Sequence, residues 1–249
     1  MDEAEPKGRA RRALLAHPVV TGALALILLG GGAFAAQQIR EMIDPPYQNV
    51  GDRVPVAPKL TAGEGEKLFR IDPSRSKVEY RIGERIVGAS ASTAVGTTKA
   101  VAGDIAWNSG TPSDSRVGRI VIDVEQLRSD STLRDARIRS DYLASHAFPL
   151  ARFDTTSLSG LPATVEDGKD VKFTMAGDLE VKAKARPVTF DATGRLDNGE
   201  LTVTATAKVK LSDFGIGPIS IGGLVSTDDE AELKISLSAV DPATPEIPT

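Results

Sequence analysis

Residue types that commonly carry catalysis or bind metals are scarce in this chain. It has two histidines, His17 and His146, and no cysteine. Disulfides, thiolate metal sites and a cysteine nucleophile are therefore excluded, and two histidines cannot form a histidine-rich metal centre. His146 stands in a Ser-His-Ala-Phe-Pro turn without an evident orienting partner. We interpret it as an incidental residue rather than a general base.

Acidic residues offer one further candidate cluster, Asp228-Asp229-Glu230. A cation site and a solvated turn are both compatible with this run, and the solvated turn is the preferred interpretation. The sequence contains no Gly-x-Ser-x-Gly elbow, no phosphate-binding glycine loop before a helix and no His-Glu-x-x-His pair. The chain is therefore predicted not to be an enzyme and to need no metal or cofactor, and a hydrolase is the least supported function.

The overall composition is that of a globular protein. Of the 249 residues, 41% are hydrophobic and 26% are charged, with a net charge of -4 and a pI near 5.4. No basic surface is indicated, and the single tryptophan and seven phenylalanines are too dispersed for a base-stacking platform. Nucleic acid is therefore not an expected partner.

An uncharged segment near the N-terminus indicates membrane insertion. Residues 18–36 read PVVTGALALILLGGGAFAA, and Arg9, Arg11 and Arg12 precede them. About 20 apolar residues span a bilayer, and positive charge stays on the cytoplasmic side. We therefore expect a cytoplasmic tail at 1–17, a transmembrane helix at 18–36 and the rest of the chain outside. The alternative is a secreted protein, cleaved as a signal peptide near Ala35.

Proline and glycine divide the rest of the chain into segments. Residues 37–65 hold four prolines and three glycines without a sustained pattern, which predicts an extracytoplasmic stalk. Residues 241–249 are also proline-rich and predict a flexible tail. Residues 66–240 lie between them and have the length of one domain with a substantial core.

Residues 66–240 are dominated by alternation of apolar and polar side chains, the pattern of half-buried strands. The longest such run is LTVTATAKVKL at 201–211, and Asp197-Asn198-Gly199 before it predicts a hairpin turn. Other runs lie at 120–125, 171–175 and 232–239. Shorter strands are expected at 76–82, 86–95, 98–107, 150–160 and 186–195.

One segment has helical spacing instead. Leu133, Ile138 and Tyr142 recur as on one helix face, Ser131 or Thr132 can cap its start, and Pro149 prevents continuation. A short helical insertion over 132–143 is therefore predicted. We expect it to pack its apolar side chains, including Leu143, against the strands and to border an entrance to the interior. Asp135 and Arg139 are four residues apart, which favours a surface ion pair.

This pattern predicts an all-β fold, an extended antiparallel barrel of about eight strands with one short helical insertion. Closure would remove exposed strand edges, and a β-sandwich is the alternative. An eight-stranded barrel either fills with side chains or encloses one small ligand. Small inward residues such as Ala205, Ala207 and Ala239 allow an open lumen, but alternation alone does not decide between a lumen and a packed core.

Five motifs resemble the YceI family in order and spacing. They are FRIDPSRSKVEYRI, LRDARIRSDYLASHAFPLARFDT, GDLEVKAKARPVTFD, DFGIG and AELKISLSA. The resemblance implies a lipocalin-like barrel with a hydrophobic pore that binds polyisoprenoids, isoprenoid quinones or fatty-acid derivatives in the bacterial envelope. It places Arg134, Asp135 and Arg139 in the family's most specific motif.

The chain departs from the family pattern at three places. Arg137 and the segment Gly83-Glu84-Arg85 stand where histidines are common, and Ala183 replaces a usual glycine. The fold prediction is unaffected by these changes, whereas the identity of the lipid is left open. If relatives use those histidines near a ligand head group, this chain cannot do so.

The resulting hypothesis is a binding protein for a long apolar lipid, tethered to the outer face of the bacterial cytoplasmic membrane by residues 18–36. The alternative is a closed-core β module that mediates protein–protein contacts in the envelope. A bound lipid is the only ligand expected, and a homodimer is left open. The side chains expected to line the pore are Val78, Tyr80, Ile120, Ile122, Val124, Leu133, Ile138, Tyr142, Leu143, Phe148, Phe153, Phe173, Met175, Phe190, Val203, Ala205 and Val209.

Overall fold

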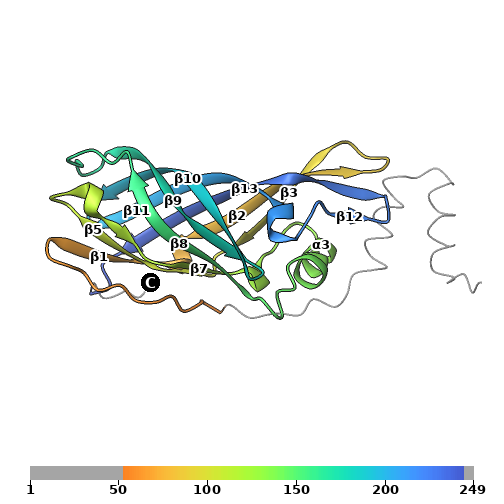
Figure 1. Cartoon of the computed structure of the whole chain (residues 1–249), viewed down its shortest axis with the longest axis horizontal. Coiled ribbons are helices and arrows are strands. Elements are labelled where there is room, and N and C mark those ends of the chain that lie inside the picture. Colours follow the sequence, from red (N-terminus) through yellow and green to blue (C-terminus); the bar gives the residue numbers. More distant parts are fainter. Residues whose placement is uncertain (1–52, 244–249) are drawn as a thin grey trace, which may run out of the picture. The chain divides into compact units, whose positions relative to one another are not determined.

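The structure is a computed structural model that describes residues 53–243. This part of the chain is mostly antiparallel β-structure with one short α-helix (Figure 1). The predicted cytoplasmic tail at 1–17 and transmembrane span at 18–36 lie outside the described residues. Within 53–243, no helix has both the length and the apolar character needed to span a bilayer.

The described strands form a single curled antiparallel sheet, so the sandwich alternative is wrong. Its main path runs β4-β7-β8-β9-β10-β11-β13-β1-β5-β6, with β2 and β12 also on β13 and β3 on β2. The strands are β1 (Glu66–Ile71), β2 (Lys77–Ile86), β3 (Ser92–Thr98), β4 (Val101–Ala102), β5 (Asp104–Asn108), β6 (Arg116–Val117), β7 (Ile120–Asp123), β8 (Leu150–Ser159), β9 (Asp170–Val181), β10 (Lys184–Asp197), β11 (Glu200–Lys210), β12 (Ser220–Ile221) and β13 (Val225–Val240).

The sheet contains more strands than the predicted eight because several are short pieces of interrupted strands. Gly103 alone separates β4 from β5, and two residues separate β6 from β7. β4 pairs with β7 while β5 pairs with β6, so the two ends of the path come together around Gly103. A Cβ on Gly103 would lie 3.1 Å from Ile71 Cδ1 and 3.2 Å from the Arg119 carbonyl oxygen. The close approach at this interruption favours glycine.

The predicted hairpin at Asp197-Asn198-Gly199 is confirmed. Asn198 and Gly199 have φ values of 50° and 80°, as a two-residue turn of left-handed residues requires, and Asp197 pairs with Glu200 across it. Along β11, Leu201, Val203, Ala205 and Ala207 are buried and alternate with threonines, as predicted.

The turn between β9 and β10 uses the same backbone conformation without glycine. Lys182 and Ala183 have φ values of 52° and 57°. For residues with a Cβ, the left-handed region costs about 1–2 kcal/mol each. Ala183 is the position where the family usually has glycine, so this substitution places a strained residue in the turn.

The helical insertion is confirmed and consists of two parts. Helix α3 (Thr132–Arg137) begins at Ser131, whose hydroxyl accepts a hydrogen bond from the Arg134 amide at 3.3 Å. A single π-turn, η4 (Ile138–Tyr142), continues it. The Asp135 carboxylate accepts hydrogen bonds from the Ser129 amide and hydroxyl, which fixes the loop before the helix.

Residues 53–65, assigned to the stalk from sequence, contact the domain directly. The Arg53 guanidinium binds the fully buried Asp123 carboxylate at 2.9 Å, and the Leu60 amide donates to Asp104 at 3.1 Å. Part of the outer face of the sheet is therefore covered, and Val121 and Asp123 are buried despite facing away from Ile120 and Ile122.

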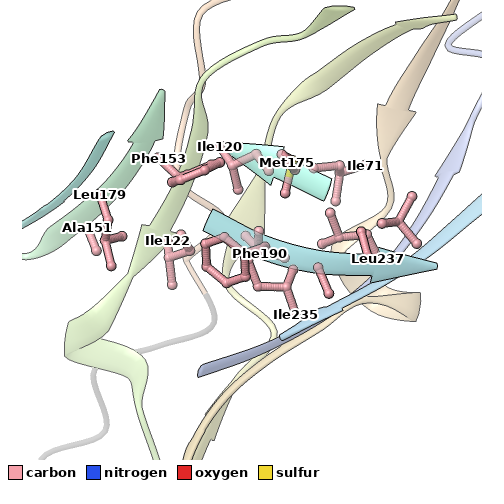
Figure 2. Packing of buried hydrophobic residues seen from close by; sticks show 14 of the residues in the cluster. Ile71, Ile120, Ile122, Ala151, Phe153, Met175, Leu179, Phe190, Ile235 and Leu237 are labelled. Carbon is pink, nitrogen blue, oxygen red and sulfur yellow. The ribbon is translucent and has the colours of Figure 1, made fainter. Parts of the chain in front are cut away.

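The apolar core lies inside the curl of the sheet. Figure 2 shows side chains from several strands meeting there, among them Ile122 of β7, Phe190 of β10 and Ile235 of β13. Phe153 is fully buried, and its ring lies over Gly177, where a Cβ would come within 2.7 Å of the ring atom Cζ. The interior is thus packed tightly at its centre.

Candidate functional site

The larger of two apolar cavities inside the sheet has a volume of about 140 Å³. It lies at the end of the interior nearest η4, and its walls come from β2, η3 (Val124–Gln126), β7 to β11 and β13 together with the segment after β11. Apart from Glu79, all the lining residues are aliphatic or aromatic, and almost all of the surface that they present to the cavity is apolar. Such a space suits an apolar ligand.

A second cavity, of about 50 Å³, lies farther along the same interior. Its walls come from β5, β6 and the parts of β7 to β11 and β13 that the larger cavity does not use, with the loop after β8. Apolar side chains again dominate, joined by Trp107, Ser115 and Arg195.

The two cavities meet at one layer of side chains. Phe153 and Phe190 line the larger cavity, while their cross-strand partners, Ile120 and Met175, line the smaller one. Figure 2 shows Phe153, Ile120 and Met175 close to one another in this layer. All four side chains are at least 97% buried. The interior is therefore divided by a packed boundary rather than open from end to end.

Most side chains predicted to face the interior line one of these cavities; their role in ligand binding stays a prediction. Those at the larger cavity are Val78, Tyr80, Ile122, Val124, Ile138, Tyr142, Leu143, Phe153, Phe190 and Val209. Those at the smaller cavity are Ile120, Phe173, Met175 and Val203.

Three of the predicted residues line neither cavity. The prediction for Phe148 is wrong: it is 39% exposed, because it follows the turn after η4 and precedes the start of β8. Leu133 is half-buried on α3 without joining the main core, since it lies on the first turn of the helix. Ala205 points inward as expected but is 1% exposed in closely packed core.

Several wall residues were missed by the sequence interpretation. Three of them continue inward-facing series already recognised in their strands, so the alternation along the strand was sufficient to find them: Ile82, Leu179 and Leu233. Leu211 is the last member of the alternating run 201–211, so the alternation indicated it as well. Three others lie in or after the 3₁₀ turn η5 (Leu211–Phe214), where no strand periodicity exists and no sequence signal would have placed them at a cavity: Phe214, Ile216 and Ile219.

Tyr80 lines the larger cavity and packs against Gly96. Its ring lies over Gly96, where a Cβ would be 2.3 Å from the ring, so the absence of a side chain there makes room for it. Burial raises the pKa of the Tyr80 hydroxyl well above its ordinary value. The hydroxyl therefore remains protonated.

Arg134, from the family motif, is held by acidic partners beside this cavity. Its guanidinium binds Glu84 at 3.1 Å and also contacts Asp130, and the side chain is only 17% exposed. Burial alone would lower the pKa of Arg134, but Asp130 and Glu84 outweigh it and the pKa is raised. Arg134 is therefore a structural residue held by ion pairs rather than a solvated surface residue. Arg139 donates to the Leu127 carbonyl oxygen at 3.3 Å.

The candidate catalytic and cation-binding residues are not brought together. Asp228 binds Arg85, Asp229 accepts hydrogen bonds from Ser212, and Glu230 binds Lys208. His146 is exposed. Between residues 53 and 243, no group of three or more histidine, aspartate or glutamate side chains is arranged to hold a metal ion.

Comparison with known proteins agrees with this architecture. The YceI-like domain model matches residues 69–239, so the chain belongs to the YceI family. No match was found among curated proteins. BcnA of Burkholderia cenocepacia is 20% identical with a TM-score of 0.55, covering 68% of this chain and 99% of its own. A polyisoprenoid-binding domain from Saccharophagus degradans, implicated in plant cell wall breakdown, is 12% identical with a TM-score of 0.52, covering 70% and 98%. At these identities, each of the two structures shows only that this chain has the same fold.

Proposed function

We propose that this chain is a non-enzymatic binding protein for a long apolar lipid of isoprenoid or acyl type, held inside the curled sheet as in an extended barrel. The single observation that carries the proposal is the pair of apolar cavities in line along the interior. The structural relative that is named as a polyisoprenoid-binding domain supports the same ligand class. The closed-core module is less favoured because its interior would be filled throughout.

The cavity volumes set a requirement on how such a ligand binds. A cavity of about 150 Å³ is known to hold a molecule the size of benzene. The larger cavity, at about 140 Å³, therefore has room for only a short part of a long chain. The whole length of such a lipid can bind only if the side chains of the boundary, Phe153 and Phe190, move so that the lipid chain occupies both cavities. Each methylene group buried contributes about 0.8 kcal/mol, which is available to offset that rearrangement.

The larger cavity is also where we expect the ligand to enter. Ile138, Tyr142 and Leu143 of the helical insertion line it, so this end is bounded by a short element rather than by a continuous strand. The Lys182 ammonium donates to the Tyr142 carbonyl oxygen at 2.8 Å and links the insertion to the β9–β10 turn. Small displacements of the insertion would admit a chain.

Extraction of the purified protein tests the proposal. Full-length protein made in bacteria and purified without detergent is extracted with organic solvent, and the extract is analysed by mass spectrometry. A Val209→Trp variant, which places a large side chain in the larger cavity, is treated in parallel with Thr204→Trp on the outer face of the same strand. We expect an apolar chain in the wild type and in Thr204→Trp and little in Val209→Trp. Absence of any chain, together with failure to bind an added polyisoprenol, would contradict the proposal.

Membrane tethering is a separate part of the proposal. We propose that residues 18–36 hold the domain on the outer face of the cytoplasmic membrane, near the source of the lipid. The support is the uncharged run and the three arginines before it. Protease added to intact spheroplasts should digest the domain, and the full-length chain should fractionate with membranes. A soluble chain that begins after Ala35 would instead identify a cleaved signal peptide.

A further inference from the structure

Two hairpins extend beyond α3 at one end of the described domain (Figure 1). One joins β2 to β3, and the other joins β12 to β13. They lie side by side, because the Val87 amide donates a hydrogen bond to the Leu224 carbonyl oxygen at 2.9 Å. We refer to residues 86–93 and 220–226 together as the hairpin tip.

The hairpin tip carries no charged residue. Residues 86–98 form an uncharged run of 13, and residues 214–227 form one of 14. These are the two longest uncharged runs between residues 53 and 243, in a chain that is 26% charged. Proteins commonly protect exposed strand edges and hairpins with charged side chains. The fold instead brings its two least charged segments together at one projecting surface.

Apolar side chains are exposed at this tip. Val87 is 70% exposed and Leu224 is 50% exposed. Residues 87–93 are exposed without interruption, and so are residues 222–224. A Cβ on any of the three glycines in these two segments would have no atom within 4 Å beyond its chain neighbours. The described chain therefore leaves the tip uncovered.

The tip is continuous with the wall of the larger cavity. Ile216 and Ile219 line that cavity and belong to the same uncharged run as the second hairpin. Ile219 directly precedes β12, where Ile221 pairs with Val225 of β13, and Val225 pairs in turn with Ile86 of β2. Apolar residues thus connect the cavity wall to the exposed tip.

The size and chemistry of the tip favour a lipid surface over a protein partner. The exposed segments hold seven residues at 87–93 and three at 222–224. A stable protein interface takes about 20–30 residues on each side. Apolar side chains can enter a bilayer interface singly, and binding there increases with the apolar area that is buried. The absence of charge suits this environment, because a charged side chain within the bilayer is costly.

We propose that the hairpin tip inserts into the surface of a lipid bilayer. No cationic residue lies in the tip, so neutral phospholipid should be sufficient and anionic lipid should not be required. Insertion would place the end of the domain with the larger cavity at the source of its ligand, a consequence that rests on the proposed lipid-binding function.

A fluorescent label at the tip tests the inference. The chain has no cysteine, so Val87→Cys or Thr204→Cys can be labelled at one position with the dye NBD. Thr204 is exposed on the outer face of β11. Each labelled full-length protein is reconstituted in phosphatidylcholine vesicles, with and without brominated acyl chains, which quench dyes inside the bilayer. We expect emission at shorter wavelength and quenching with the label at position 87, and neither effect at position 204.

A charge on the tip should prevent insertion. Leu224→Asp is added to the labelled Val87→Cys protein, and we expect the quenching to be lost. Val56→Asp is the matched control, because it adds the same charge to a valine that is 89% exposed outside the tip. This control should keep the quenching. The comparison of positions 87 and 204 needs no substitution at Leu224, so the inference stays testable if Leu224→Asp fails to fold.

The outcomes separate this inference from the proposed function. Absence of quenching at position 87, equal quenching at position 204, or unchanged quenching in Leu224→Asp would refute insertion of the tip. An emission shift without quenching that grows with protein concentration would identify a second copy as the partner and also refute it. If the tip inserts but the protein neither carries an apolar chain nor binds an added polyisoprenol, the proposed function fails while the bilayer contact stands.

Discussion

The rings of Phe153 and Phe190 meet edge to face, with centroids 5.1 Å apart and planes at 80°. They join β8 to β10 across the interior and form part of the boundary between the two cavities. Edge-to-face pairs of this kind contribute about 0.5–1.5 kcal/mol beyond the area that they bury. The boundary is therefore stable in the empty protein, and a long ligand has to displace it.

Truncation of one ring should open this boundary at a cost in stability. We expect Phe190→Ala to lower the free energy of unfolding of ligand-free protein by about 3–5 kcal/mol, because a fully buried ring is lost and a cavity remains. The joined space should also favour longer apolar chains, which mass spectrometry of the extracted ligand would detect.

Phe148→Ala is the matched control for this measurement. Phe148 is 39% exposed, so the same truncation should change the free energy of unfolding by no more than about 0.5 kcal/mol. Urea denaturation of delipidated protein compares the two. Equal losses in both variants would show that Phe190 does not belong to a packed boundary.

The turn between β9 and β10 offers a stabilising substitution. Ala183 has a φ of 57°, a conformation that glycine adopts without strain. After the greater freedom of glycine in the unfolded chain is subtracted, we expect Ala183→Gly to raise the free energy of unfolding by about 0.5–1 kcal/mol. Ala185→Gly, two residues later on exposed strand β10, should lower it by a similar amount. A loss of stability in Ala183→Gly would argue against the left-handed turn.

The sequence was most informative where one face of a strand is buried. In β11 and β13 the alternation assigned the inward side chains correctly, because one side of each strand packs in the core and the other is in contact with solvent. It was less informative in β7, where Arg53 pairs with Asp123 on the outer face and Val121 is buried there as well. Contacts from a distant segment leave no periodic signal in the strand that they cover.

The cavities could not be predicted from the sequence. A cavity forms where inward-facing side chains leave space between them, and alternation does not show where that happens. Ala205 and Val209 share one face of β11, yet Ala205 is packed in the core and Val209 lines the larger cavity. Likewise Phe148 and Phe153 belong to the same family motif, but only Phe153 turns inward. The size and the apolar character of a residue therefore did not indicate whether it lines a cavity.

Glu66 should make stability depend on pH in the acidic range. Hydrogen bonds from Arg116 and from the Gly63 amide lower the pKa of Glu66 from 4.5 to about 2. Because the pKa is lower in the folded state, this carboxylate stabilises the fold above about pH 4.5, and the contribution is lost as pH falls toward 2. We expect Glu66→Gln to lose less stability than wild type between about pH 6 and about pH 3.

Glu64→Gln is the control for this pH dependence, since it removes the same charge from an exposed position two residues away. Urea midpoints at the two pH values give the comparison. Glu64→Gln should follow the wild type. An unchanged pH dependence in Glu66→Gln would mean that the Arg116 contact does not persist in solution.

Filling the larger cavity should separate ligand binding from stability. Val209 lines this cavity and is half-buried, so Val209→Phe has space to enter and should change the free energy of unfolding by less than about 0.5 kcal/mol. The added ring occupies the volume that the ligand would use, and lipid retention should fall. Ala205→Phe, on the same face of the strand, has no cavity beside it and should cost about 1–3 kcal/mol through overpacking. Delipidated protein gives the stabilities, and mass spectrometry of extracts gives the retention. If Val209→Phe were the more destabilising of the two variants, the larger cavity would be closed in solution. The proposal of lipid binding would then lose its main support.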